Sequence, residues 1–521
     1  MDIALKRVAQ AAAVALVATA LTGTAAAQPA DNRPTLRVAV QANPPTAEVL
    51  DAESNVGYRA NYSVHDTLLQ IDFAGDYSVK GHLAQSWKWI SPTVLEVTLK
   101  RGIKFHDNTE MTADDVVFSF GPERLTGEKA PGRPMVRRYW VSLDKVEKTG
   151  PYVVRFTTKY EDPIFEQRLT AWTSQIISKA AYLKAGSYDA WRLKPVGAGP
   201  FKVERITPND SIVLTAHDGY WGGKPNAKSV VFKVVPEVAS RIAGLLSGDY
   251  DIATDLPPDQ LEVIDKNKAK GVGIVGGPIN NHRVIWFDKT HPVLKDPRVR
   301  QAMILSIDRK AIVDSIWNGR TKLSNGLQYD FFGKMYLKDY PAYRYDPEGA
   351  KKLLAEAKYN GEEITFRAFN NYYTAELPTA QAMISMWQAV GLNVRLVMVE
   401  PGGGLHAPGN GRAAGDWSNS ALLPDPLFSL WSQHGPASVQ KQQGIWENEE
   451  FYKLGEKLER STKLEDRRAA FKAMLDISEW TDPGISVLHQ NAVFYGIRTN
   501  VDWKPYVFLY MDLGPQRLKF K

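Results

Sequence analysis

The chain has 521 residues, of which 23% are charged and none is cysteine, and its formal net charge is +6 at pH 7. Without cysteine it forms no disulfide and offers no thiol for a lipid anchor. The small basic excess is spread along the chain, which argues against nucleic-acid binding, and a chain longer than about 250–300 residues is expected to divide into domains.

The N-terminus has the three parts of a secretory signal peptide. Lys6 and Arg7 supply a positive start, residues 11–21 form an apolar run, and Ala25-Ala26-Ala27 are the small residues that signal peptidase accepts. Because this run is shorter than the ~20 residues needed to span a bilayer, we expect cleavage rather than anchoring. The sequence therefore predicts a signal peptide over residues 1–27, a net charge of +5 for the remainder, and a periplasmic protein that is neither a lipoprotein nor membrane-spanning.

The first predicted elements of the mature chain are two strands and a capped helix. Thr35–Val40 (TLRVAV) and Val94–Lys100 (VLEVTLK) alternate in polarity, as half-buried strands do. A helix is predicted to begin at Thr112, whose hydroxyl can cap the free amides, with Asp115 three residues later as its reciprocal partner.

Further along, helical and strand patterns continue to alternate. Asp296-Pro297 predicts the start of a second helix, which we expect to run to Gly319. A third helix is predicted over residues 378–390, followed at once by a strand over residues 393–399. Such alternation predicts an α/β fold with more than one sheet.

Motifs for catalysis are missing from the sequence, apart from one formal match to a nucleotide-binding pattern. Gly271, Gly273 and Gly276 fit G-x-G-x-x-G, but the phosphate-binding form must open a helix, and here Pro278 and a strand-like stretch follow. We interpret this stretch as a glycine-rich crossover between domains. The sequence thus predicts a protein that is not an enzyme and that has no cofactor and no metal site.

Four blocks carry a resemblance to a known family. They are Leu83–Phe120, Val196–Phe201 (VGAGPF), Pro236–Ile252 (PEVASRIAGLLSGDYDI) and Leu294–Arg309 (LKDPRVRQAMILSIDR). In this order they resemble the large solute-binding proteins that serve dipeptide, oligopeptide and nickel ABC importers, known as family 5. The resemblance implies a two-lobed periplasmic-binding-protein fold, type II-like, with a two-strand hinge and an extra subdomain in the first lobe.

The resemblance also implies the division of the chain and its partners. Lobe I is expected to comprise residues 34–275 and 490–521, with the subdomain at about 61–195, and lobe II residues 276–489. A small ligand would bind between the lobes and favour the closed form through its higher affinity for that state. The implied partners are the inner-membrane ABC permease subunits, and the protein itself is expected to be a monomer.

The ligand is predicted from one segment of the second lobe. In peptide-binding members of the family, the segment that resembles Gly415–Phe428 carries an aspartate for the peptide's α-ammonium, shortly before an acidic-Pro pair. Here Asp425-Pro426 matches the pair, but the aspartate position falls on Leu422, and Asp416 is the nearest substitute. The preceding Trp417, Ser418, Asn419 and Ser420 offer a stacking face and neutral hydrogen-bonding groups, which suit a polyhydroxylated ligand such as a sugar.

Other candidate ligand contacts lie at the hinge and after a strand. Arg283 has the planar fork suited to a carboxylate or phosphate, and the alternative is an ion pair within the protein. The remaining candidates, each of which can instead be structural, are Asn281, His282, Asn371, Tyr372, its neighbour Tyr373, Arg133 and Asp425.

Taken as a whole, the chain also resembles periplasmic proteins that capture opines of the sugar-phosphate type, such as agrocinopine. That resemblance implies an anionic, sugar-bearing ligand. A di- or oligopeptide ligand is the alternative within the family. A secreted hydrolase, or an adaptor that presents ligand to a chemoreceptor, are the alternatives from other classes.

Overall fold

A computed structural model of the chain describes residues 31–369, 372–400, 404–409 and 411–521. The predicted signal peptide and Asn371 lie outside the described residues. Residues 34–521 form one structural unit, to which the following description applies. Among the described residues, no helix combines the length and apolar character needed to cross a membrane.

A mixed sheet of ten strands runs through this unit. Its strand order is β14-β13-β15-β12-β16-β11-β1-β10-β9-β8. The strands are β1 (Thr35–Val40), β8 (Phe201–Thr207), β9 (Ser211–Ala216), β10 (Ser229–Val234), β11 (Ile252–Ala253), β12 (Val272–Phe287), β13 (Ile364–Phe369), β14 (Val394–Val399), β15 (Ala414–Ser420) and β16 (Ile485–Arg498).

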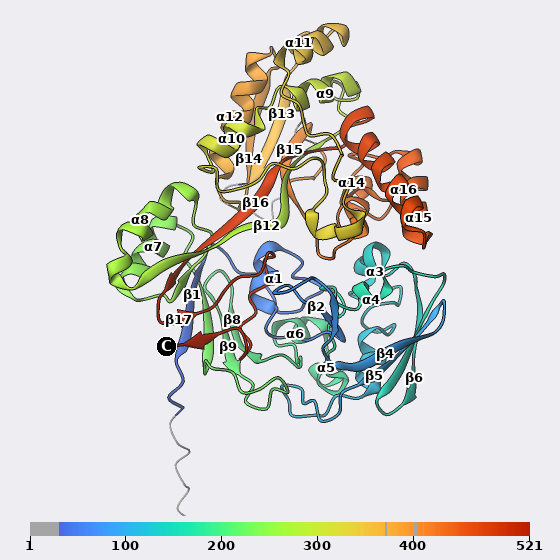
Figure 1. Cartoon of the computed structure of the whole chain (residues 1–521), viewed down its shortest axis with the longest axis vertical. Helices are drawn as coiled ribbons and strands as arrows, with labels where there is room; N and C mark the ends of the chain where they lie inside the picture. Colours follow the sequence, from blue (N-terminus) through green and yellow to red (C-terminus); the bar gives the residue numbers. More distant parts are fainter. Residues whose placement is uncertain (1–30, 370–371, 401–403, 410) are drawn as a thin grey trace, which may run out of the picture. The chain divides into compact units, whose positions relative to one another are not determined.

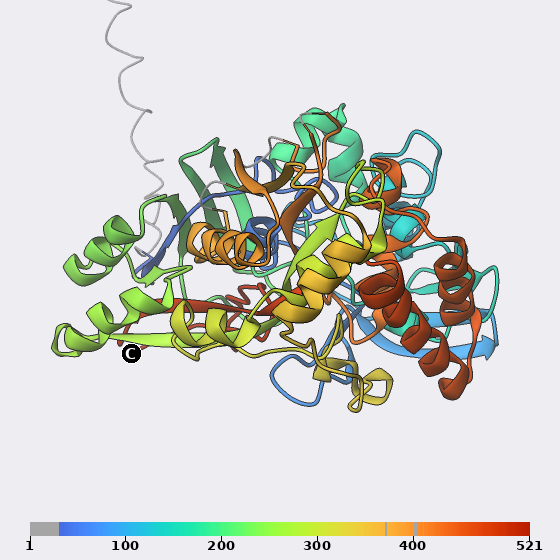
Figure 2. The same ribbon diagram turned by 90° about the horizontal axis from the view of Figure 1, so that it is seen from above.

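The long strands β12 and β16 connect the two ends of this sheet. They pair antiparallel and lie side by side in both ribbon views (Figure 1, Figure 2). The strands β11, β1, β10, β9 and β8 follow on one side of the pair, and β15, β13 and β14 on the other. The register of the ladder shifts between Pro278 and His282, which is where the sequence predicts the hinge. Gly273 and Gly276 lie in β12 and Gly271 directly precedes it, so this glycine-rich stretch leads into a strand rather than a helix.

Smaller sheets complete the strand structure. One four-stranded sheet, β4-β5-β7-β6, lies within the range predicted for the extra subdomain. Its strands are β4 (Ala84–Ser91), β5 (Val94–Leu99), β6 (Leu143–Gly150) and β7 (Val153–Thr158); the two-stranded sheets pair β2 (Leu69–Ile71) with β3 (Val79–Gly81), and β17 (Val501–Asp502) with β18 (Lys519–Phe520).

Helices are distributed along the whole chain. They are α1 (Asn55–Asn61), α2 (Ala113–Ser119), α3 (Arg133–Tyr139), α4 (Phe165–Arg168), α5 (Lys179–Ala185), α6 (Tyr188–Leu193), α7 (Val238–Ser247), α8 (Leu261–Lys266), α9 (Pro297–Leu305), α10 (Arg309–Ser315), α11 (Pro347–Glu356), α12 (Glu376–Ala389), α13 (Leu430–His434), α14 (Val439–Gln442), α15 (Glu449–Arg460) and α16 (Leu464–Asp476).

The predicted starts of α2 and α9 are confirmed, with Asp296 as the N-cap of α9, and the predicted length of the second helix is wrong. Thr112 and Asp115 form the predicted capping box of α2, in which the Thr112 amide donates to the Asp115 carboxylate at 2.9 Å. The helix predicted from Asp296 to Gly319 is in fact two helices, α9 and α10. Asp308 starts the second, because its carboxylate accepts the amide of Ala311 at 2.9 Å and so offers the backbone a new N-cap.

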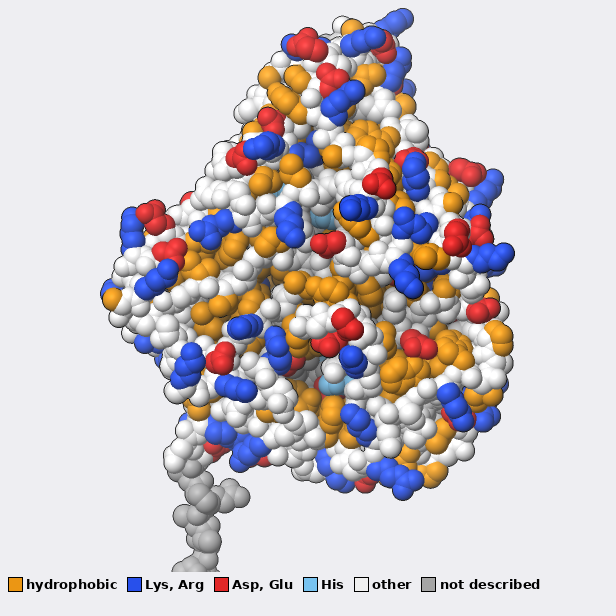
Figure 3. All heavy atoms as spheres, viewed as in Figure 1, with side chains coloured by type: hydrophobic (Ala, Val, Ile, Leu, Met, Phe, Trp, Pro, Cys, Tyr) orange, Lys and Arg blue, Asp and Glu red, His pale blue; other side chains and the backbone are white. Residues whose placement is uncertain are grey.

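Side chains of both charges are mixed over the surface. On the face shown in Figure 3, Lys and Arg are interspersed with Asp and Glu. This agrees with the spread of charge predicted from the sequence.

Candidate functional site

A cavity of about 310 Å³ lies between segments that the sequence assigns to different lobes. Residues 53–58 and 138–139 supply one wall, and residues 372–440 supply the other. Most of its lining is aromatic or neutral polar: Tyr58, Tyr139, Tyr372, Tyr373, Trp417 and Phe428, with Ser54, Asn55, Ser418, Ser420, Ser432, Gln433 and Gln440. Such a surface offers ring faces for stacking and hydroxyl or amide groups for hydrogen bonds.

The two groups of candidate residues near the hinge are brought together by strand pairing. In the β12–β15 ladder, Asn281 lies opposite Ser420, His282 opposite Asn419, and Arg283 opposite Ser418. The candidates nevertheless divide between two environments. Trp417, Ser418, Ser420 and Tyr372 line the cavity, whereas Asn281, His282, Arg283 and Asn419 do not.

Arg283 is held by carboxylates of the protein itself. Its guanidinium donates to Asp416 and lies 3.6 Å from Glu376, and its side chain is only 2% exposed. Burial disfavours the charge of Arg283, but Asp416 and Glu376 together raise its pKa above the usual value. This arrangement matches the alternative of an ion pair within the protein, and ligand contact through Arg283 stays a prediction.

His282, Asn281 and Asn419 form a polar layer behind the cavity wall. The Nε2 of His282 lies 2.6 Å from the Ser324 hydroxyl, and its ring stacks on Tyr329 at 4.1 Å. Burial lowers the pKa of His282 to about 3, so the ring is neutral at pH 7. Asn281 donates to the Ser420 hydroxyl at 2.6 Å, and the Tyr329 hydroxyl donates to the main chain of Asn419 at 2.6 Å.

Asp425 also has partners within the protein. Its carboxylate caps the short helical turn Pro426–Phe428 and pairs with Arg467 at 2.9 Å. Arg133, the other predicted cleft candidate, pairs with Glu128 and is not among the cavity-lining residues. These contacts do not support ligand binding by Asp425 or Arg133, and for both residues that role stays a prediction.

Two charged residues of the cavity were missed by the sequence reasoning. Arg138 donates to Glu53 at 2.8 Å, and the Tyr139 hydroxyl donates to the other oxygen of the same carboxylate at 2.6 Å. Both charges therefore face the cavity as a neutralised pair. The contact joins residues 85 positions apart, and no local pattern could have revealed it.

Leu422 lies in the cavity wall and is 4% exposed. Glu53 is the carboxylate among the described lining residues, and Arg138 already neutralises it. His406, another lining residue, has a pKa lowered to about 4 by burial and by the nearby Arg412 and Arg367. At pH 7 the cavity thus presents neutral hydrogen-bonding groups and one internal ion pair.

Tyr372 and Tyr373 separate this cavity from a second one of about 660 Å³. Their rings meet edge-on at 4.7 Å. Glu376 fixes the segment by accepting the main-chain amides of Phe369 at 2.7 Å and Tyr373 at 2.9 Å. The buried carboxylate of Glu376 therefore fixes the main chain that carries the two tyrosines.

Comparison with protein families gives a match over most of the chain. The model described as bacterial extracellular solute-binding proteins, family 5 Middle, matches residues 78–438. The chain belongs to family 5 of the bacterial extracellular solute-binding proteins. A family 5 relative from Pseudomonas aeruginosa (strain UCBPP-PA14), named "Probable di/tripeptide-binding protein 5", is 30% identical over 343 residues, which are 62% of this chain and 64% of that protein. The match thus spans less than two thirds of the relative's length.

Solved structures of similar fold include binding proteins with quite different ligands. The dipeptide binding protein from Pseudoalteromonas sp. SM9913, in complex with Met-Leu, has a TM-score of 0.83 at 22% identity, covering 94% of this chain and 100% of that one. The binding protein AgaA from A. tumefaciens R10, in complex with agropinic acid, has a TM-score of 0.79 at 22% identity, covering 94% and 99%. These likenesses confirm the predicted α/β, two-lobed periplasmic-binding-protein fold.

In the part of the chain that the structure describes, no group of three or more His, Cys, Asp or Glu side chains is arranged to hold a metal ion.

Proposed function

We propose that this chain is the periplasmic solute-binding component of an ABC importer, a carrier rather than an enzyme. It captures a small ligand between lobe I (residues 34–275 and 490–521) and lobe II (residues 276–489) and delivers it to the permease. Family membership supports the role. The cavity between segments of the two lobes, and the register shift of the β12–β16 ladder beside it, support the location of the site.

The ligand that we propose is a small anionic solute that carries a sugar, an opine or sugar phosphate such as agrocinopine. The lining of the cavity is the observation that carries this proposal. It combines ring faces with serine, asparagine and glutamine side chains, and it includes Leu422. In the sequence, Leu422 stands where the resemblance to peptide-binding members leads us to expect an aspartate. The negative group would be met by Arg138, whose partner Glu53 can keep its bond to Tyr139.

Cavity size supports a small ligand. A volume of about 310 Å³ is at the lower end of the ~300–1,000 Å³ usual for small-molecule sites. The alternative ligand is a di- or oligopeptide, which the name of the Pseudomonas relative favours. At this size a dipeptide fits that alternative better than a long peptide does.

A thermal-shift screen of the mature protein tests both ligand classes. The panel contains opines, sugar phosphates and short peptides. A ligand at a hundredfold excess over its Kd stabilises the native state by about 2.7 kcal/mol and so raises Tm. We expect a shift with a sugar-bearing anion that Trp417→Ala reduces, because Trp417 lines the cavity. Shifts with peptides alone would replace the proposed ligand with the alternative, and a chemically altered ligand recovered afterwards would overturn the carrier role.

A further inference from the structure

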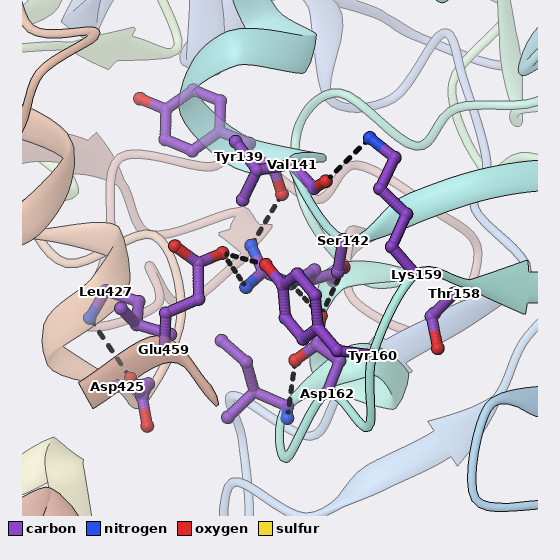
Figure 4. A network of polar contacts seen from close by, with 12 residues as sticks. Tyr139, Val141, Ser142, Thr158, Lys159, Tyr160, Asp162, Asp425, Leu427 and Glu459 are labelled. Carbon is purple, nitrogen blue, oxygen red and sulfur yellow. Dashed lines mark hydrogen bonds and ion pairs between the residues drawn. The ribbon is translucent and has the colours of Figure 1, made fainter. Parts of the chain in front are cut away.

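One buried ion pair joins the two proposed lobes beside the cavity. Glu459, in α15, accepts a hydrogen bond from Arg168 at 3.2 Å and another from the Tyr160 hydroxyl at 3.0 Å. Figure 4 shows Glu459 and Tyr160 pointing toward each other from different parts of the chain. The side chains of Arg168 and Glu459 are 2% and 8% exposed, so the contact is shielded from water.

Each half of this contact has a second partner in its own lobe. Arg168 also donates to Asp162 at 2.6 Å, and Glu459 also accepts from the indole of Trp431 at 3.1 Å. If the lobes separate, Arg168 keeps its carboxylate and Glu459 keeps its donor, and water reaches both. The ion pair can therefore break without leaving a buried, unpartnered charge, which is the condition for a reversible contact.

The same arginine supports two residues of the cavity wall. Its guanidinium donates to the main-chain oxygen of Tyr139 at 2.6 Å and lies 5.5 Å from the centre of the Phe428 ring. Tyr139 comes from lobe I and Phe428 from lobe II, and their rings stack at 5.0 Å with an interplanar angle of 16°. Both rings line the cavity. The ion pair and this part of the cavity wall thus form together.

We propose that Arg168, Tyr160 and Glu459 form an interlobe latch that favours the closed arrangement before ligand binds and that positions the Tyr139–Phe428 wall. The inference rests on the proposed function, in which the ligand is captured between the lobes. None of the three residues lines the cavity, so the latch acts through lobe closure rather than through ligand contact. A substitution that weakens the latch lowers the closed population and raises the apparent Kd by the same factor.

The absence of cysteine makes the test direct, because two introduced cysteines are the only labelling sites. Spin labels at Lys145→Cys, in β6, and Lys453→Cys, in α15, report the distance between the lobes; the two side chains are 53% and 76% exposed. The ligand-free mature protein, unfolded, dialysed and refolded, is measured by pulsed EPR. We expect a dominant short distance, which Glu459→Gln shifts to longer values by raising the open-to-closed ratio roughly tenfold or more.

Two further variants keep the test decisive. Glu456→Gln changes an exposed carboxylate on the same helix and should leave the distances unchanged. Tyr160→Phe removes one hydrogen bond to Glu459 and keeps the ion pair, so it should give a smaller shift and remains available if Glu459→Gln does not fold. Identical distances in wild type and both latch variants, or a wild type that is already open, would overturn the latch. Neither result bears on ligand capture, because the thermal-shift screen measures ligand binding separately.

Discussion

Arg283 lies over the ring of Tyr373, with its guanidinium carbon 3.9 Å from the ring centre. It also pairs with Asp416 and Glu376, and Glu376 accepts the amide of Tyr373. Arg283 thus stabilises Tyr373, which lines the cavity, both by direct contact and through Glu376. A residue that the sequence suggested as a ligand contact is here bonded to the residues that shape the site.

We therefore expect Arg283→Ala to destabilise the protein. The substitution leaves Asp416 and Glu376 as two buried carboxylates without their cation, and removing one partner of a buried pair costs about 3–5 kcal/mol. Urea unfolding should show a lower midpoint with an unchanged slope. Arg133→Ala is the matched control, because its ion pair with the exposed Glu128 is worth at most about 1 kcal/mol. Normal stability combined with a 10- to 150-fold loss of ligand affinity would instead identify Arg283 as a direct contact.

Glu479 gives a pH-dependent prediction. Burial raises the pKa of its carboxyl from 4.5 to about 7, although Leu327 donates an amide to it at 2.6 Å. Between these pH values the folded state binds the proton more tightly than the unfolded state does. Glu479 therefore contributes roughly 3 kcal/mol to the free energy of unfolding. This contribution is fully present below about pH 4.5 and is lost as the pH rises through 7.

Glu479→Gln should remove this component. The free energy of unfolding of the Glu479→Gln variant should fall less between pH 5 and pH 8 than that of the wild type. Urea denaturation at a series of pH values measures both. Glu465→Gln, at an exposed position of α16, serves as the control and should follow the wild type. Parallel curves for the wild type and Glu479→Gln would show that Glu479 is ionised throughout.

Local sequence signals predicted the elements well where a few neighbouring residues contain all the information. Thr112 and Asp115 specify their capping box by themselves, and Thr35–Val40 is a strand with the predicted bounds. The break between α9 and α10 was missed although Asp308 is a good N-cap residue, because the prediction assigns the apolar residues Ile312, Ile316 and Trp317 before Gly319 to the helix that begins at Asp296.

The cavity could be predicted only in part, because its residues are brought together by contacts that a single sequence does not reveal. Trp417, Ser418 and Ser420 were found because the family segment marks them, and all three line the cavity. Arg138 was missed because it reaches the site only through the packing of α3 against Glu53. The environment of Arg283 follows from its ion pair with Asp416 of β15, 133 positions away in the sequence.

Secretion is tested at the N-terminus. If Ala25-Ala26-Ala27 is cleaved, the mature protein begins at Gln28, since signal peptidase cuts after small residues. Expression with the full leader should place the protein in the osmotic-shock fraction, and mass spectrometry should give the mass of residues 28–521. Exported protein that still begins at Met1 would contradict the signal peptide.

The ligand class is tested by Leu422→Asp. Leu422 lies in the cavity wall, where a carboxylate would face a bound molecule and pair with a peptide's α-ammonium. A hydrogen bond that involves a charged group contributes about 1.5–3 kcal/mol, so dipeptide affinity should rise roughly 10- to 150-fold over the wild type. Isothermal titration with alanylalanine measures the gain.

Leu422→Asn separates charge from shape in this experiment, because it has nearly the same size as the aspartate and no charge. It should leave dipeptide binding weak, while both variants lose affinity for the sugar-bearing anion, the aspartate more than the asparagine because its charge repels the ligand. Micromolar binding of alanylalanine by the wild type, unchanged in Leu422→Asp, would mean that the ammonium is held elsewhere in the cavity. Glu53 would then be its partner, released from Arg138, and the ligand would be a peptide.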